Sequence, residues 1–332
     1  MIEQGQHTLL LGAVGTAERP IPFGVTERDR AQHVIIFGED DTDTVAYVRH
    51  LFLQDVELGT RTILIDKKGN IADAVRKESS HTRRDAITLI APPSDARMLS
   101  SALPDLEHAG SVCVIDLSGV TDSGAVSELV ECVMQKVDAS NTSDSVPLSL
   151  YLCGFSWGDE TVLTNLFTQT CERNVSLTIQ SRTLATLGHI SPKILFEQVG
   201  TVVAFRVATS DADVLEDIFQ PKCFASDLAC LEPGHFYITL MVRGVRSEPF
   251  RAWTHFPTQP RETRRVAPRA EQSIVESSSA KEQEVTFSVA VEEIVDDLSL
   301  ASASERPQTP LLTPQALTRM MRLKIDDVPR LR

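Results

Sequence analysis

The sequence lacks any apolar run long enough to cross a membrane. Its longest runs, such as Val34–Phe37 and Thr239–Val242, have the length of strands, whereas a spanning helix needs roughly 18 apolar residues. The N-terminus carries Glu3 and has no Lys or Arg before Leu9–Leu11, which is not the pattern of a signal peptide. We therefore expect a cytoplasmic protein with no membrane insertion.

A C-x-x-C pair is also missing. Cys113 and Cys153 lie inside apolar runs, where a reduced cysteine behaves as a small hydrophobic residue. This usage predicts a reducing compartment, with neither a metal site nor a disulfide framework. The six cysteines are Cys113, Cys132, Cys153, Cys171, Cys223 and Cys230.

The sequence has no excess of basic residues. Its net charge is −14, and residues 257–332 hold 11 Lys and Arg against 12 Asp and Glu, which leaves 21 against 34 in residues 1–256. Because DNA-binding proteins need basic surface to displace counterions from phosphates, the balance of −13 argues against direct DNA binding by the monomer. A ring or a local basic patch remains open.

Strand-like and helix-like segments alternate from about residue 33 to 255. Most strand candidates are continuous runs of Val, Ile and Leu, as expected for strands buried on both faces of a parallel sheet. Helical patterns lie between them, for example at 123–137 and 159–172. This alternation predicts a mostly parallel, doubly wound α/β sheet. The strand candidates are 33–37, 62–66, 87–90, 111–117, 148–153, 175–179, 200–207 and 235–242.

The composition divides the chain into three parts. Residues 1–30 are interpreted as a short β segment that precedes the main domain, which we place at 31–256. Residues 257–332, rich in Pro, Ser and mixed charge, are predicted to be largely disordered. Two short amphipathic segments interrupt this tail, at 285–299 and from Thr313 to about Ile325; each is either a partner-docking helix or a piece that packs on the core.

The first strand leads into a loop with the outline of a P-loop but not its chemistry. In the pattern G-x-x-x-x-G-K-[ST], glycines let backbone N–H groups wrap phosphates, Lys reaches the β- and γ-phosphates, and Ser or Thr binds Mg²⁺. Gly38 follows the strand in the right place. Asp43, Thr44 and Val45 then stand where the second Gly, the Lys and the Ser/Thr are required.

Electrostatics oppose nucleotide binding at this loop, which carries four carboxylates (Glu39, Asp40, Asp41 and Asp43). A carboxylate about 4 Å from a phosphate charge is repelled by roughly 1 kcal/mol in water and about 4 kcal/mol at an effective dielectric constant of 20. The loop also lacks the Gly and distal Glu of a calcium loop. We interpret it as a solvated acidic turn whose charges favour the start of the next helix.

The order of these segments resembles the ATPase domain of conjugative type IV secretion coupling proteins and the related HerA/FtsK-like DNA translocases. The resemblance runs from about Gly24 to Thr254. It includes the strand that starts at His33 and a run from Ile65 to Asn70 similar to Asp-Pro-Lys-Gly-Asp. Further matches are Val112–Ser118, the Phe-Arg…Asp-Ala element at 205–212, and the turn 231–236. The resemblance implies a RecA-like P-loop NTPase fold.

The departures from the family fall at its catalytic positions. The family's Walker B strand ends in Asp-Glu, whereas here Cys153 and Gly154 occupy these places. Gln180 matches a glutamine that senses nucleotide in the family. Asp116 could replace a missing acid, but an aspartate that ends a buried strand is more often a turn or cap residue. Gln180 and Arg206 are likewise interpreted as structural.

This pattern predicts a pseudoenzyme without ATP or Mg²⁺, which acts as a scaffold or adaptor in DNA transfer and can be recruited to a membrane complex. Its expected partners are an active ATPase of the same fold or a secretion or relaxase component. The alternative is a nucleotide-binding translocase subunit completed by residues of a partner ATPase in a ring, with Arg206 reaching a neighbour's site. A non-specific DNA-binding protein is a third hypothesis, which the charge of residues 1–256 disfavours.

Overall fold

The computed structural model describes residues 8–39, 42–78, 87–90, 110–120, 129–136, 147–157, 160–188 and 191–254. All of them belong to one compact unit. The tail 257–332, with both of its amphipathic segments, lies outside the described residues. In the described part of the chain, no helix is both long enough and apolar enough to span a membrane.

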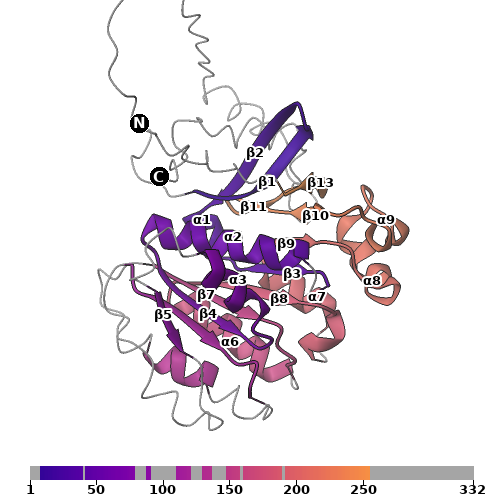
Figure 1. The fold of residues 1–332 in the computed structure, drawn as a ribbon. Coiled ribbons are helices and arrows are strands. Elements are labelled where there is room, and N and C mark those ends of the chain that lie inside the picture. The colour runs from indigo at the N-terminus through magenta and orange to yellow at the C-terminus, as the bar shows by residue number, and fades with distance from the viewer. Residues whose placement is uncertain are drawn as a thin grey trace, which may run out of the picture. The chain divides into compact units, whose positions relative to one another are not determined.

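A parallel sheet forms the centre of this unit (Figure 1). Its strand order is β9-β3-β8-β7-β4-β6-β5, and every neighbouring pair in this series runs parallel. The prediction of a mostly parallel sheet is therefore confirmed. The strands are β3 (Val34–Phe37), β4 (Arg61–Asp66), β5 (Ile87–Ile90), β6 (Val112–Asp116), β7 (Leu148–Cys153), β8 (Val175–Ser181) and β9 (Thr201–Ala204).

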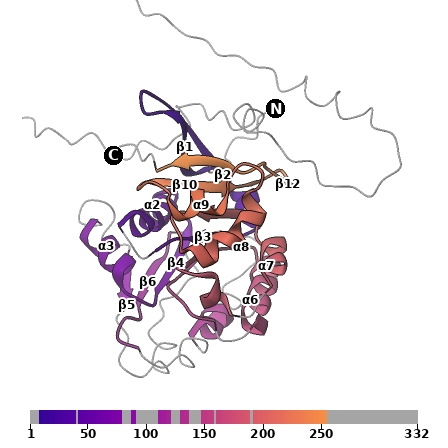
Figure 2. The same ribbon diagram turned by 90° about the vertical axis from the view of Figure 1, so that its right-hand side faces the viewer.

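Helices cover both faces of this sheet (Figure 2). α2 (Thr42–Leu58) and α3 (Asn70–Glu78) lie on one face, and α6 (Glu160–Glu172) and α7 (Pro192–Gln198) lie on the other. The two faces hold separate apolar cores, and β3 contributes to both: Ile36 packs with the α2 side and Ile35 with the α6 side. This two-sided burial explains why β3 is apolar at every position rather than at alternate ones.

Further helices precede β3 and follow β8 and β9 along the chain. α1 (Glu27–Arg30) precedes β3, and the 3₁₀ helix η3 (Leu184–Leu187) follows β8. α8 (Thr209–Phe219) and α9 (Ala225–Ala229) lie between β9 and the next strand. Of the helix predicted at 123–137, residues 129–136 are described, and these are helical.

Antiparallel strands extend the sheet beyond β9. β10 (His235–Thr239) pairs with β9, β13 (Phe250–Trp253) with β10, β1 (Thr8–Thr16) with β13, and β2 (Arg19–Thr26) with β1. The opening β segment is thus part of the same sheet, and its β1–β2 hairpin projects from it (Figure 1). No feature of the sequence indicates this pairing.

The single strand predicted at 235–242 is divided in the structure. β10 ends at Thr239, and Leu240 exchanges two hydrogen bonds with Ser247, at 2.7 and 3.0 Å. β11 (Met241–Val242) then pairs with β12 (Val245–Arg246) across a two-residue turn. Both turn residues, Arg243 and Gly244, have positive φ (51° and 79°), which suits the right-handed twist of a tight hairpin.

Candidate functional site

The candidate site lies along the edge of the sheet at which the parallel strands end. In a doubly wound sheet the loops at this edge hold the ligand. Six of the nine predicted site residues occur at or just beyond these strand ends, on five different strands, and the other three (Asp43, Thr44 and Val45) lie in the first turn of α2. Gly38 follows β3, Asp116 ends β6, Cys153 ends β7 and Gly154 follows it, Gln180 lies at the end of β8, and Arg206 follows β9.

The counterpart of the P-loop keeps the strand–loop–helix arrangement, because β3 ends at Phe37 and α2 begins at Thr42. The Gly38 N–H donates to the Ser181 carbonyl oxygen at 3.2 Å. A Cβ atom at Gly38 would lie 2.6 Å from Thr44 Oγ1 and 2.9 Å from Phe205 Cβ. Glycine is therefore required here for close packing, with or without a nucleotide.

The three replaced P-loop positions have structural contacts of their own. Asp43 Oδ2 accepts a 2.7 Å hydrogen bond from the Gly234 N–H, which ties the first turn of α2 to the turn before β10. Thr44 is only 1% exposed. Val45 packs against the apolar core on the α2 side of the sheet. Asp40 and Asp41 lie outside the described residues.

Arg206 faces the same loop. Its guanidinium NH2 nitrogen lies 3.8 Å from Glu39 Oε2, and both side chains are about half exposed. A surface ion pair of this kind contributes about 0–1 kcal/mol to stability. Arg206 is thus placed at the loop, in a contact weak enough to be exchanged.

The end of β7 provides no acid where the Walker B residues would stand. Cys153 is fully buried, in register with Asp66 of β4 and Gln180 of β8. Burial raises the pKa of other thiols in this fold, for example that of Cys113 to about 12. Cys153 itself packs in the apolar core on the α2 side of the sheet. Gly154 has a φ of 71°, and its N–H donates to the Gln180 carbonyl oxygen at 3.2 Å.

The Lys68 side chain occupies the space beside Gly154, since a Cβ atom at this glycine would lie 3.1 Å from Lys68 Cγ. Gln180 itself is 3% exposed and lies in β8 between β3 and β7. Its position beneath the loop, rather than in it, agrees with a structural role.

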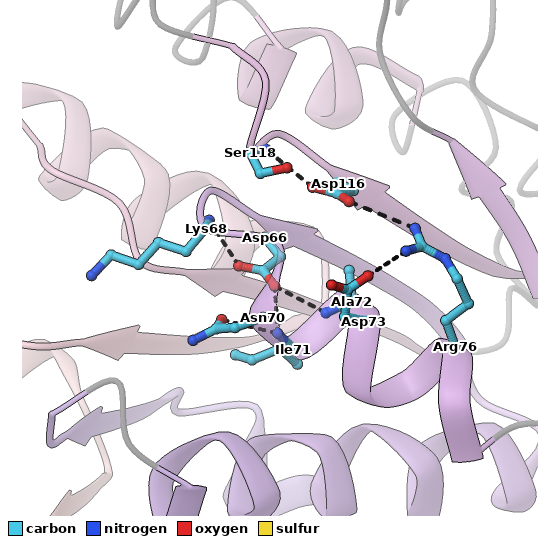
Figure 3. A network of polar contacts seen from close by, with 9 residues as sticks. All are labelled: Asp66, Lys68, Asn70, Ile71, Ala72, Asp73, Arg76, Asp116 and Ser118. Atoms are coloured by element: carbon cyan, nitrogen blue, oxygen red, sulfur yellow. Dashed lines mark hydrogen bonds and ion pairs between the residues drawn. The ribbon is translucent and has the colours of Figure 1, made fainter.

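Asp66 is a further carboxylate at this edge, which lies within a quoted motif but was not singled out from the sequence (Figure 3). It ends β4 and is fully buried. Its Oδ2 accepts hydrogen bonds from the N–H groups of Ile71 (2.7 Å) and Ala72 (2.9 Å), and its Oδ1 accepts from the Lys68 N–H (3.0 Å). Asp66 thus satisfies N–H groups in the first turn of α3 that have no partner within the helix.

Burial raises the pKa of Asp66, and the backbone hydrogen bonds from Ala72, Lys68, Gly69 and Ile71 only partly oppose this effect. The available signal in the sequence was an aspartate directly after a buried strand and four residues before a helix start. That signal predicts a cap as readily as a catalytic acid.

Asp116 is held by its own turn and by α3 (Figure 3). Its Oδ1 accepts from the Ser118 N–H at 3.0 Å, and its Oδ2 lies 3.6 Å from the Arg76 NH2 nitrogen. Burial tends to raise the pKa of Asp116, but the Ser118 hydrogen bonds and the Arg76 charge outweigh it, so the net pKa is lowered. Gly69 makes close approach possible here, because a Cβ atom on it would lie 2.8 Å from Asp116 Oδ1.

A magnesium nucleotide does not fit the residues present at this edge. The lysine position is a buried threonine, the second glycine position is a carboxylate already bonded to Gly234, and β7 ends without an acid. No group of three or more His, Cys, Asp or Glu side chains that could hold a metal ion occurs among the described residues. Among the described residues, the counterparts of the P-loop and Walker B positions therefore lack the lysine, the second glycine and the acids of the family's pattern.

Comparison of sequences finds no matching family model and no significantly similar curated protein. Comparison of structures finds the bacterial conjugative coupling protein TrwBdeltaN70 in its unbound form, at 11% identity and a TM-score of 0.50, over 74% of this chain and 88% of that one. The plasmid coupling protein TrwB bound to the ATP analogue ADPNP is similar at 10% identity and a TM-score of 0.50, over 69% and 86% of the two chains.

The genome packaging NTPase B204 of Sulfolobus turreted icosahedral virus 2, bound to AMPPCP, matches at 9% identity and a TM-score of 0.46, over 68% of this chain and 100% of that one.

Proposed function

The chain has the RecA-like P-loop NTPase fold, shared with the coupling protein TrwB, and we propose that it is a pseudo-ATPase that acts as a scaffold or adaptor. The observation that carries this proposal is the state of the P-loop counterpart. Its strand, first glycine and helix are retained, while Asp43 and Thr44 occupy the two positions that contact phosphate and are committed to protein contacts.

A triphosphate at this loop would meet an unfavourable net charge. An ammonium group about 4 Å from a phosphate charge contributes roughly 4 kcal/mol at an effective dielectric constant of 20, and a carboxylate at that distance costs a similar amount. Replacing lysine by Thr44 and glycine by Asp43 changes both terms in the unfavourable direction. Each 1.4 kcal/mol is a tenfold change in affinity, so these two replacements suffice to abolish micromolar binding.

An adaptor needs only a stable fold and intact surfaces, and both are present. The cap of α3 by Asp66, the Asp43–Gly234 hydrogen bond and the two apolar cores keep the edge of the sheet in place without a nucleotide. The fold likeness to TrwB supports partners from a conjugation or type IV secretion system, including an active ATPase of the same fold. The charge of −13 in residues 1–256 supports action through proteins rather than through direct DNA contact.

Equilibrium binding of a fluorescent ATP analogue with Mg²⁺ tests the proposal. We expect no saturable binding below about 1 mM by the natural chain. The matched comparison is the triple variant Asp43→Gly/Thr44→Lys/Val45→Ser, which restores the P-loop pattern on the same scaffold. Measurable binding by the variant alone supports the assignment of the defect to these residues, whereas micromolar Mg²⁺-dependent binding by the natural chain refutes the proposal.

The second candidate function is a subunit whose site is completed by a partner ATPase in a ring. Arg206 favours it, because this half-exposed guanidinium lies at the loop edge and pairs with Glu39, among the described residues, at a long distance of 3.8 Å. Here an Arg206→Ala variant would lower ATP turnover by a mixed ring with an active partner, while Arg182→Ala would not. Equal turnover with either variant would remove this candidate.

A further inference from the structure

The surface formed by α8 and α9 carries the most exposed of the large apolar side chains in the described part of the chain. Phe224, at the start of α9, is 59% exposed. A large aromatic group left in water within an acidic surface suits a contact that is both apolar and basic. We call this surface the α8–α9 face and define it by Asp213, Glu216, Asp217, Phe224 and Asp227.

Two carboxylates bind the backbone at Phe224. Asp227 Oδ2 accepts from the Phe224 N–H at 2.9 Å, and Glu216 Oε2 accepts from the N–H of the next residue, Ala225, at 3.0 Å. Asp213 and Asp217 are exposed and four residues apart, which places them on one stripe of α8. Between residues 209 and 230 there are five acidic residues and a single basic one.

The chain itself contains a segment of the complementary chemistry. Residues 313–325 hold Arg319, Arg322 and Lys324 and no acid, together with Met320 and Met321 at helical spacing from Leu317. Methionine adapts to irregular surfaces and makes favourable sulfur–aromatic contacts. The other amphipathic segment, 285–299, has four acidic residues and no basic one, so charge excludes it from this face.

The connection is long enough in sequence. The 58 residues from 255 to 312 give sufficient reach, since a flexible chain of that length spans about 40 Å on average. Tethering at this length raises the local concentration of the segment to about the millimolar range, so weak contacts suffice for docking.

We propose that residues 313–325 dock as an amphipathic helix on the α8–α9 face of the same chain. Met320 and Met321 cover Phe224, and Arg319 and Arg322 pair with the carboxylates of α8 and α9. Docking removes the exposed aromatic group from water. A partner with a more strongly basic and apolar segment would displace residues 313–325 and bind the α8–α9 face in their place. This inference does not rest on the nucleotide site, and it holds or fails independently of the proposed function.

Two native cysteines provide a direct test in the full chain. Cys230 is exposed at the end of α9, and Cys171 is exposed at the end of α6, outside the α8–α9 face. In the variant Met320→Cys, a short thiol–thiol cross-linker is expected to join residue 320 to Cys230 at least about tenfold more often than to Cys171, because the docked segment is held at the face. Peptide mapping by mass spectrometry gives the ratio, and equal yields overturn the proposal.

Charge exchange tests the pairing itself. When Arg319→Glu/Arg322→Glu is added to Met320→Cys, the cross-link between residue 320 and Cys230 should become as rare as the cross-link between residue 320 and Cys171. Further exchange of Asp213→Lys/Asp217→Lys should restore it, because the two reversed sets attract again. A yield that is unchanged by the arginine exchange, or not restored by the second exchange, overturns the pairing.

The matched control is Arg264→Glu/Arg265→Glu, which makes the same charge change outside residues 313–325 and should leave the cross-link unchanged. Mixing isotopically heavy and light chains before cross-linking distinguishes docking within a chain from exchange between chains. Light–light and heavy–heavy products alone support the proposal, whereas mixed products overturn its intramolecular form.

Discussion

His33 immediately precedes β3, the strand that leads to the candidate site, and its burial makes the stability of the protein depend on pH. The side chain is fully buried and stacks on Phe167. Nδ1 accepts from the Leu177 N–H at 3.3 Å, so Nε2 carries the proton of the neutral ring; it lies 3.2 Å from Cys171 Sγ and 3.3 Å from Thr170 Oγ1. Burial lowers the pKa of His33 to about 4.

The sign and size of the effect follow from linkage. An unfolded histidine titrates with a pKa of about 6.5, so only the unfolded state binds this proton between pH 6.5 and 4. The stabilising contribution of neutral His33 is complete above pH 6.5 and is lost as the pH falls toward 4. A shift to about 4 makes the loss between pH 7 and pH 5 about 1.8 kcal/mol.

The assay is urea unfolding of the natural chain and of His33→Asn at pH 7, 6 and 5. Asparagine tolerates the positive φ of 65° at this position and does not titrate. His50, whose pKa burial also lowers to about 4, contributes equally to both proteins and cancels. We expect the natural chain to lose about 1.8 kcal/mol more than the variant between pH 7 and pH 5; parallel pH profiles would refute a neutral, buried His33.

Three further substitutions test contacts at the site and its supports, each by denaturant unfolding. Gly38→Ala should cost about 1–3 kcal/mol, because the new methyl group overlaps Thr44 and Phe205; a neutral effect would contradict the close packing. Asp66→Ala should lower the free energy of unfolding by about 3 kcal/mol, about 1 for each of three lost hydrogen bonds. The control Asp73→Ala, which removes an exposed carboxylate from the same helix, should cost less than about 0.5 kcal/mol. Arg246→Met should cost about 2–3 kcal/mol, since Arg246 donates to the carbonyl oxygens at the end of α7; an unchanged midpoint would show that water replaces it.

The parallel part of the fold could be predicted because burial on both faces leaves a strong signal in each strand. Runs such as Leu148–Cys153 are apolar or small at every position, and few alternatives suit such a run between helical patterns. The antiparallel extension left no such signal. β1 and β13 share Ala13 and Trp253 as paired residues from opposite ends of the described chain, and local periodicity carries no information about which distant strand will be the neighbour.

The position of the candidate site could be predicted from the sequence, but the contacts that its residues make could not. The spacing from His33 to Val45 predicted a loop between a strand and a helix, and in the structure β3 ends at Phe37 and α2 begins at Thr42. It could not show that Asp43 bonds to a backbone N–H 191 residues away, because that contact depends on the β10 turn meeting the loop in three dimensions. Asp66 was missed for a related reason, since cap and catalytic aspartates follow buried strands alike.

These contacts explain why a degenerate loop can keep its shape. In an active P-loop, a charged ligand helps to hold the helix start, the first glycine and the neighbouring strand together. Here protein groups provide the same restraints: Asp43 holds the Gly234 turn, Thr44 fills the space beside Gly38, and Lys68 covers Gly154. Under the proposed function, the replacements at positions 43 and 44 that oppose nucleotide binding are also the ones that supply contacts within the protein. The proposed scaffold would thus need no ligand to hold these elements together.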